Sequence, residues 1–521
     1  MKIAFVMVGT NIDFFGARRV AAVTRKIEKS TDIFFITIDN QRSIFSFLNP
    51  KEGNTFSSFD ADIISEKLAC YDIVCFSSMT NTIGCVFLIV KKLRERSNKI
   101  FTLLGGVHAT LSPNDSIDKF DAICIGDGEK PMQRFLESYK DGKDYYNIKG
   151  LWFNKGGAIL KNPQETLNSN DELNEFQIGY DGFDSFIYDV KKKNFSQFTK
   201  YDYLEFNGLG YFTAWVLGCP YICSYCSNSG FASIDKNYRK IRYSKPEVII
   251  REIEEAIVRH PYISTINIFG DNSIMLPFDV LEEFCDLYKS RINLPFSMTG
   301  IHPNTINKEK VELLASCGMI ETSMGIQSGN ERSLKLYDRN TSFETISRAV
   351  GILADAQKKY NMIPPYYDVI IDNPMETKDD IVTSLQFYNN LKRPFFFSVF
   401  SLCSIPGTKL SSYFEENNIK SYNSTTYRIA RPTLNNALVY LISCFKVPDW
   451  IFEKLLSRIK GYDEKQQEYP LLLWISRTLK MFLHGFAHLK KLNFSAIAGR
   501  WLYWYWKLFG RKKQRFTENT L

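Results

Sequence analysis

The first 145 residues alternate short apolar runs with amphipathic segments of helical length. Apolar runs of about four to eight residues favour buried strands, and apolar positions at helical spacing favour helices packed on them. The strand candidates are residues 3–8, 33–38, 73–77, 101–105 and 122–126. This rhythm predicts a doubly wound parallel sheet over residues 1–145.

Residues 146–205 lose the rhythm and become rich in Asn, Asp, Lys and Gly, which predicts a linker. A second rhythm fills residues 206–420. Its strand candidates are residues 212–217, 265–269, 296–299, 321–326, 367–371 and 395–402. Six strand–helix units predict an incomplete (β/α)6 barrel, and residues 421–521 predict a helical C-terminal extension. The fold class is therefore α/β.

Three places in this second region have the residues typical of a helix N-terminus. Ser244 with Glu247, and Thr341 with Glu344, have the spacing of a capping box, and Thr377 is followed by acidic residues. Each stands before an apolar helical pattern, so each predicts a helix N-terminus.

Composition narrows the class of protein. The chain has 521 residues, 45% of them hydrophobic, which is enough for two or three domains with cores of their own. The net charge of +8 does not by itself favour nucleic acid as a partner. The chain has no uncharged apolar stretch of about 18 residues, and it begins directly with a strand pattern, so we expect a cytoplasmic protein. Eleven dispersed cysteines are typical of reduced thiols.

Three of these cysteines are clustered in "LGCPYICSYCSNS", at positions 219, 223 and 226. A structural zinc site needs four ligands, and the nearest histidine, His260, is poorly placed to be the fourth. Three thiolates on a four-iron cluster would leave one iron open to a substrate. The cluster follows the first predicted barrel strand, on the face where barrels carry their chemistry. Zinc, or a chance grouping of buried thiols, is the alternative.

The Cys-x3-Cys-x2-Cys spacing, with Tyr225 before the last cysteine, resembles the signature of the radical S-adenosylmethionine (SAM) superfamily. The resemblance covers about residues 205–415. It implies a [4Fe-4S] cluster on Cys219, Cys223 and Cys226 that reductively cleaves SAM to methionine and a 5′-deoxyadenosyl radical. It also implies an electron donor such as flavodoxin or ferredoxin.

Later motifs agree with this resemblance. "IFGDNSI" and "MGIQSGNERSLKLYDRN" match the ends of the second and fourth family strands, although the glycine-glycine-glutamate form is absent from the first. The resemblance assigns SAM contacts to Asp271, Gln327, Ser328 and Arg339, and Gln327 stands where the family often has Glu. Taken singly, such residues are also typical of turns.

Glycines mark the strand ends of the N-terminal region, at Gly9, Gly105, Gly106 and Gly126, with Ser77 beside them. Glycine lets a backbone approach a large ligand closely. The turns "GGVHAT" and "IGDGE" resemble cobalamin-binding domains that precede radical SAM barrels, over about residues 1–140. The loop "GTNIDFFGARR" has no histidine to offer cobalt. His108 is a candidate contact to the cofactor or an ordinary turn histidine, and a sheet that no longer binds cobalamin is the alternative.

Other features have two interpretations. His484 and His488 would share one face of a helix, and without an acidic residue nearby in the sequence we expect ordinary packing. Cys317 and Cys403 could give hydrogen to a radical or belong to the core. The aromatic-basic segment "WLYWYWKLFGRKK", residues 501–513, suits either a peripheral membrane contact or packing on the barrel.

Three functions follow from these patterns. The first is cobalamin-dependent radical methylation of an unactivated carbon, and the second uses the same cofactors for cyclisation, rearrangement or oxidation. The third is a non-enzymatic iron-sulfur or zinc module. The substrate class, a small molecule or a lipid-like one, stays open in this sequence.

Overall fold

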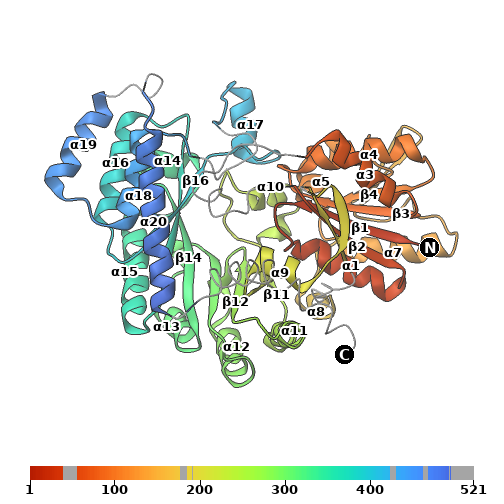
Figure 1. Ribbon diagram of the computed structural model, residues 1–521, viewed down its shortest axis with the longest axis horizontal. Helices are drawn as coiled ribbons and strands as arrows, with labels where there is room; N and C mark the ends of the chain where they lie inside the picture. The colour runs from red at the N-terminus through yellow and green to blue at the C-terminus, as the bar shows by residue number, and fades with distance from the viewer. Residues whose placement is uncertain are drawn as a thin grey trace.

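The computed structural model describes residues 1–38, 56–176, 185–190, 192–422, 430–461, 467–491 and 493. Two domains built on sheets lie next to each other, and the C-terminal helices lie beside the second domain (Figure 1). The N-terminal domain is drawn in red and orange, the second domain mainly in green, and the C-terminal helices in blue. The α/β fold class is confirmed.

The N-terminal sheet has the strand order β7-β6-β5-β4-β3-β1-β2-β8-β9, and its central strands are parallel. All seven residues of β1 are buried, as expected for a strand covered on both faces. One face packs against α3 and α4 and the other against α1 and α7, each over its own apolar core. The central elements are β1 (Ile3–Gly9), α1 (Phe15–Ile27), β2 (Thr31–Thr37), α3 (Ser58–Leu68), β3 (Ile73–Ser78), α4 (Ile83–Arg96), β4 (Phe101–Gly105), α5 (Val107–Leu111), α6 (Pro113–Ser116), β5 (Ala122–Cys124) and α7 (Glu129–Lys140).

The segment expected to be a linker extends this sheet at both edges. A hairpin of β6 (Leu151–Lys155) and β7 (Ala158–Lys161) adds antiparallel to β5. At the other edge, β8 (Ser185–Asp189) pairs with β2 and β9 (Asn194–Gln197) pairs with β8. Strands β7 and β9 are only four residues long and mostly exposed, so they lack the buried apolar runs of the central strands. Helices α8 (Asn170–Glu175) and α9 (Lys200–Asn207) complete the segment.

The second domain is an open barrel of six parallel strands with the short antiparallel β11 at its edge, in the order β11-β10-β12-β13-β14-β15-β16. Helices packed on its outer face close a single large core. The elements are β10 (Gly210–Leu217), α10 (Ser227–Ile234), β11 (Arg242–Tyr243), α11 (Pro246–Arg259), β12 (Thr265–Gly270), α12 (Phe278–Arg291), β13 (Phe296–Ile301), α13 (Lys308–Ser316), β14 (Met319–Gln327), α14 (Glu331–Leu336), α15 (Phe343–Lys359), β15 (Tyr366–Ile371), α16 (Lys378–Asn390), β16 (Phe396–Ser401) and α17 (Lys409–Glu416).

One of the three predicted helix starts is confirmed as written. Thr377 caps α16 in a capping box with Asp380. The helix near Thr341 is instead capped by Ser342, whose side chain accepts from the Thr345 N–H. A helix also begins next to Ser244, but its N-cap position is Lys245, which makes no side-chain cap and precedes Pro246 in the first turn of α11. Proline fixes φ and has no N–H to satisfy, so the helix can begin there without a capping side chain.

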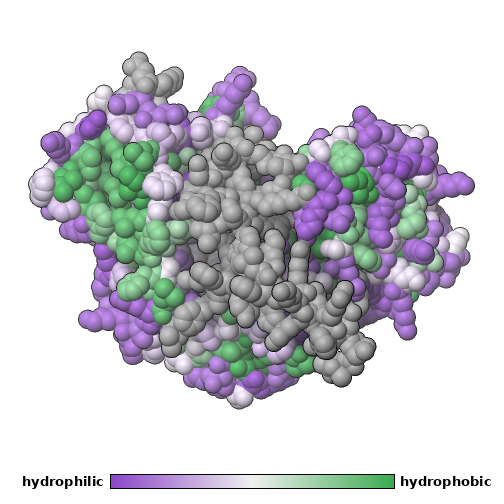
Figure 2. Space-filling model, in the orientation of Figure 1, coloured by the Kyte–Doolittle hydropathy of each residue, from purple (hydrophilic) through white to green (hydrophobic). Residues whose placement is uncertain are grey.

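Three further helices follow the barrel: α18 (Leu434–Cys444), α19 (Asp449–Gly461) and α20 (Pro470–Lys490). Hydrophobic side chains gather at the surface over α18 and α20 (Figure 2). In the part of the chain that the structure describes, no helix has both the length and the apolar character needed to cross a membrane. The aromatic-basic segment 501–513 lies outside the described residues, and its membrane contact stays a prediction.

Candidate active site

The three clustered cysteines lie in the loop that joins β10 to α10. Cys226 directly precedes α10, and its N–H donates to the carbonyl of Cys223 at 3.0 Å. Ser224 holds the loop from within: its N–H donates to the Tyr337 carbonyl at 2.9 Å, and its hydroxyl donates to the Leu336 carbonyl at 2.7 Å. The end of α14 therefore fixes the loop that carries the thiols.

Burial decides the protonation of these thiols. It raises the pKa of Cys219 to about 11 and that of Cys226 to about 12. Both are neutral near pH 7 until a metal binds, because coordination removes the thiol proton. The loop thus supplies three sulfur ligands, which would become thiolates when a metal group binds.

Arg339 lies against this loop. The family resemblance assigned it a contact to SAM. One guanidinium nitrogen is 3.6 Å from Cys223 Sγ and donates to the Tyr225 hydroxyl at 3.1 Å. The other donates to the Gly325 carbonyl, and the Nε atom is buried without a partner in the described chain. The structure thus places a fixed positive charge beside Cys223.

Asp271 and Asn272 follow β12 on the other side of the loop. The Asp271 carboxylate accepts from the Gly218 N–H at 2.6 Å, one residue before Cys219. Asn272 is completely buried, and its side chain favours the thiolate of Cys219. Asp271 therefore supports the cysteine loop directly, and Asn272 contacts the same loop at Cys219.

Gln327 ends β14 with a φ of 66°, in the left-handed region that a glutamine seldom adopts. Such backbone conformations are often kept at binding sites. Ser328, by contrast, is 1% exposed, and its hydroxyl accepts from the Asn330 N–H at 3.1 Å. The turn after β14 thus presents Gln327 to the interior and uses Ser328 to hold its own shape.

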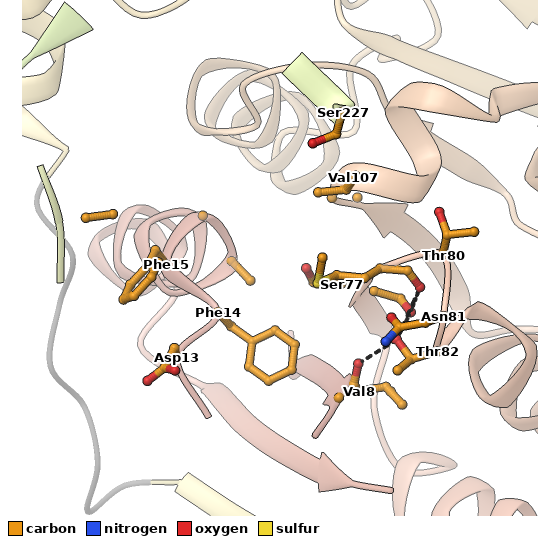
Figure 3. Close-up of a pocket in the computed structure, with 18 of the residues that line it drawn as sticks. Val8, Asp13, Phe14, Phe15, Ser77, Thr80, Asn81, Thr82, Val107 and Ser227 are labelled. Atoms are coloured by element: carbon orange, nitrogen blue, oxygen red, sulfur yellow. Dashed lines mark hydrogen bonds between the residues drawn. The ribbon is translucent and has the colours of Figure 1, made fainter. Parts of the chain in front are cut away.

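A cavity of about 1050 Å³ lies between the two domains. Seven residues expected to touch cofactors line it together: Gly9, Ser77, Gly105, Gly106 and Gly126 from the N-terminal sheet, and Tyr225 and Gln327 from the barrel. In Figure 3, Ser227 from the start of α10 lies next to Val107 of the N-terminal domain, and both line the cavity. The cavity therefore joins the strand ends of one domain to the cysteine loop of the other.

The loop after β1 presents aromatic rings to this cavity. Phe14 and Phe15 both line it, and Figure 3 shows the Phe14 ring directed inward. A Cβ atom at Gly9 would lie 2.6 Å from the Phe14 ring, so only glycine leaves room for that ring. Where a histidine could have faced cobalt, this loop offers an apolar surface.

His108 is placed beside the cavity but does not line it. Its ring is 3% exposed and lies 3.2 Å from the Thr80 hydroxyl and 3.1 Å from an Asp115 carboxylate oxygen. Both ring nitrogens thus have partners within the N-terminal domain. Asp271, Ser328 and Arg339 also lie outside the cavity lining, around the cysteine loop or the turn after β14.

Three carboxyl groups whose pKa values are raised by burial line the cavity, and sequence analysis missed all of them: Asp13, Glu129 and Asp368. Burial raises the pKa of Asp13 and of Asp368 to about 6 each. Asp368 accepts from the Ser323 hydroxyl at 3.0 Å, whereas one oxygen of Asp13 has no partner in the described residues. An acidic residue inside the apolar strand pattern "YYDVII" was the available signal, since charged residues are seldom buried without a purpose.

The two cysteines considered as hydrogen donors lie in different surroundings. Cys403 lines the cavity, and burial raises the pKa of its thiol to about 11. Cys317 lies in the barrel core, with its sulfur 2.6 Å from that of Cys285. Only Cys403 therefore lies where a cavity ligand could reach it.

The domains are held against each other at the edge of the cavity. Arg242 on β11 donates to Asp127 at 2.6 Å and to the Asn168 carbonyl at 3.0 Å. At another contact, a Cβ atom on Gly230 would lie 2.7 Å from the Leu111 side chain and 2.8 Å from the Gly407 carbonyl. Glycine at position 230 thus allows α10 to approach the N-terminal domain closely.

The residues present fit the groups that the sequence resemblance implies. The three thiols suit an iron-sulfur cluster. The cavity is at the upper end of ordinary ligand sites, which hold about 300–1,000 Å³, as a large cofactor requires. A Cβ atom on Gly105 would lie 3.9 Å from its nearest neighbour, so the backbone there leaves space for a ligand. The unpartnered Asp13 oxygen could accept a hydrogen bond from a cofactor amide.

Two domain families match the chain. Residues 215–388 match the radical SAM superfamily, and residues 53–136 match the B12 binding domain. The chain therefore contains a radical SAM domain, preceded by a B12-binding domain.

Individual relatives are distant. The anaerobic magnesium-protoporphyrin IX monomethyl ester cyclase of Rubrivivax gelatinosus is 23% identical over 305 residues, which cover 56% of this chain and 51% of the cyclase. The chain thus aligns with about half the length of that relative.

Two solved structures share the fold. The radical SAM methyltransferase TsrM of Kitasatospora setae, with cobalamin and a [4Fe-4S] cluster bound, has a TM-score of 0.60 at 14% identity. The match covers 80% of this chain and 75% of TsrM. The cobalamin-dependent radical enzyme OxsB, with aqua-cobalamin bound, has a TM-score of 0.56 at 14% identity, over 94% of this chain and 76% of OxsB. At this identity the likeness establishes the architecture.

Proposed function

We propose that this chain is a cobalamin-dependent radical SAM methylase that acts on an unactivated carbon. The observation that carries the proposal is the single cavity lined both by the N-terminal strand ends and by Tyr225 of the cysteine loop. A cobalamin on the strand ends and a SAM at the cluster would then face the same enclosed space. When bound, the cluster would supply the electron that cleaves SAM, and cobalamin would supply the methyl group.

The chain's own residues would position these groups and exclude water. Cys219, Cys223 and Cys226 would ligate three irons and leave the fourth for SAM. Gln327 would contact SAM from the end of β14, and the Phe14 ring would cover one face of the corrin. The Arg242–Asp127 ion pair, at 2.6 Å, keeps the two domains together around the cavity.

The substrate would enter the same cavity, whose lining is largely apolar with a few polar groups. Asp368, Cys403 and Ser404 line its barrel side. With its pKa raised to about 6 by burial, Asp368 can change protonation near neutral pH and could hold a polar group of the substrate. A small molecule or the polar end of a lipid-like molecule would suit this lining, with reducing equivalents delivered by a flavodoxin or ferredoxin.

The second candidate uses the same cofactors for cyclisation, rearrangement or oxidation without methyl transfer. The likeness to the cyclase named above favours keeping it. The two candidates differ in their products. Methylation converts one SAM to S-adenosylhomocysteine and another to 5′-deoxyadenosine, whereas the alternative gives 5′-deoxyadenosine without S-adenosylhomocysteine.

The test begins with anaerobic purification of the protein, expressed with cobalamin supplied and its cluster intact. Near-stoichiometric cobalamin, seen by absorbance, would justify incubating the protein with candidate substrates and SAM labelled in its methyl group. Equal amounts of both co-products, with the label in the product, would support methylation. SAM cleavage by protein that binds no cobalamin would contradict it.

A further inference from the structure

Helix α20 turns a polar stripe toward the barrel and an apolar face outward. Ser476, Lys480, His484 and His488 are each four residues apart and therefore share one side of the helix. Ser476 is completely buried and His488 is 6% exposed, whereas Phe482 is 67% exposed. Figure 2 shows hydrophobic side chains at the surface over this helix. A surface helix normally has the opposite polarity, so the inward polar groups need partners.

The partner comes from the inner face of the barrel. Along β14, Met324 and Ile326 pack into the core beneath the outer helices, while Glu321 and Gln327 lie on the alternate, inner face. One Glu321 carboxylate oxygen is 3.6 Å from Nε2 of His484 and 3.6 Å from Nε2 of His488. Those two nitrogens are 2.8 Å apart. Three ligand atoms thus converge on one point between α20 and β14.

Aromatic rings orient the first of these histidines. The His484 ring lies 4.8 Å from the ring of Tyr366 and 5.4 Å from that of Phe396, both on neighbouring strands. Lys480, one turn earlier on α20, is directed to the Tyr366 ring at 5.3 Å. The imidazole is therefore held with its Nε2 atom toward Glu321.

The three distances between the ligand atoms are compatible with a small metal ion between them. Zinc bonds of about 2.0–2.1 Å at tetrahedral angles separate two ligand atoms by about 3.3–3.4 Å. The three separations of 2.8, 3.6 and 3.6 Å bracket that value. Two histidines and one carboxylate are a common ligand set for zinc, with a fourth position left for water. The His484 and Glu321 side chains are 25% and 19% exposed, so water can reach that position.

We propose that Glu321, His484 and His488 bind a zinc ion that clamps α20 to the inner face of the barrel. The site is separate from the cysteine loop. Glu321 and Gln327 are six positions apart along β14, which places the zinc site about 20 Å along the strand from Gln327. Its role is to fix the C-terminal helix, independently of the reaction proposed above.

The decisive measurement is the metal content of the full-length protein with its iron-sulfur cluster intact. Keeping the cluster in place keeps zinc off the three cysteines. After dialysis against zinc and removal of excess metal, we expect about one zinc per chain in addition to the cluster iron. Glu321→Gln and His484→Asn should each lower the zinc at least about tenfold and leave the iron unchanged. Glu282→Gln, at an exposed position on α12, is the matched control and should keep the zinc.

A second measurement keeps the proposal testable if a variant folds poorly. Adding zinc to the chelated wild-type protein should raise its melting temperature, because an ion that binds only the folded chain stabilises it. His484→Cys keeps a zinc-binding atom at that position and should regain part of this response, whereas His484→Asn should not. Wild-type protein that holds no zinc beyond background and shows no shift in melting temperature would overturn the proposal. Zinc that persists in Glu321→Gln and His484→Asn would overturn it as well.

Discussion

The two ends of β14 carry two different kinds of site. At its C-terminal end, Gln327 faces the cavity shared with the cysteine loop, whose three thiols lie within eight residues of sequence. At its other end, Glu321 meets His484 and His488, more than 160 residues away in the chain. Soft sulfur ligands in one loop and mixed nitrogen and oxygen ligands from two distant elements favour different metals. One barrel can therefore separate a reactive centre from a structural one.

The largest effect should follow loss of a cysteine ligand. Cys223→Ala should lower the rate of 5′-deoxyadenosine formation by about 100-fold or more, because the cluster would lose one of its three sulfur ligands. Iron content and the rate of SAM cleavage would be measured together. Cys70→Ala changes an exposed cysteine and should behave as wild type. If zinc content also fell in Cys223→Ala, the two ends of β14 would not be independent.

A smaller effect is expected at the cavity end of β14 itself. Gln327→Ala should raise the KM for SAM about tenfold, the equivalent of about 1.4 kcal/mol and of one lost hydrogen bond at the upper end of its range. The cluster iron should stay bound, since Gln327 is not a ligand. Gln386→Ala, on the exposed side of α16, serves as the control. An unchanged KM would remove Gln327 from the SAM site.

At the opposite end, a chelator should act on stability alone. Removing zinc with a mild chelator should lower the melting temperature by about 2–3 °C, because an ion present at about 100 times its Kd stabilises by about 2.7 kcal/mol. In a chain of 521 residues each kcal/mol shifts the melting temperature by about 1 °C. The initial rate of SAM cleavage should change less than twofold, because α20 lies away from the cysteine loop. A parallel fall in activity and melting temperature would show that α20 also shapes the cavity.

The smallest effect concerns Asp368, which lies between the two ends on the neighbouring strand. Burial raises its pKa from an ordinary 3.8 to about 6, so the folded chain holds a proton that the unfolded chain has released. This contribution to stability is full below the unfolded pKa and is lost as pH rises through about 6. Asp368→Asn keeps an oxygen that can accept from Ser323 but does not ionise.

The melting temperature of Asp368→Asn, relative to wild type, should therefore increase by about 1 °C between pH 5 and pH 7.5. Asp286→Asn, at an exposed position on α12, should show no such trend. A difference that does not vary with pH would mean that Asp368 is ionised throughout this range.

Much of the fold was predictable because its strands are buried on both faces. The apolar runs of β1, β10 and β15 were found within about two residues of their observed bounds, as continuous buried strands allow. Edge strands β7 and β9 were missed because a strand exposed to water needs no apolar pattern. The cap of α11 was assigned one residue too early, because Pro246 lets the helix begin without a capping side chain.

The candidate sites, too, differ in how much of them the local sequence could predict. Sequence alone determined the cysteine loop, since ligands a few residues apart are close in any compact fold of that loop. It also indicated the glycine-rich strand ends, because backbone geometry restricts those positions locally. The tertiary structure decided that the strand ends and the cysteine loop share one cavity, and that His108 faces away from it.

Only the tertiary structure could place Glu321 beside His484 and His488. In the sequence the histidines have no acidic neighbour, so packing was the natural expectation. Strand alternation puts Glu321 on the inner face of the barrel, and the reversed polarity of α20 puts the histidines opposite it. A contact between elements so distant in the chain depends on how the whole barrel closes, and local sequence pattern carries no information about that.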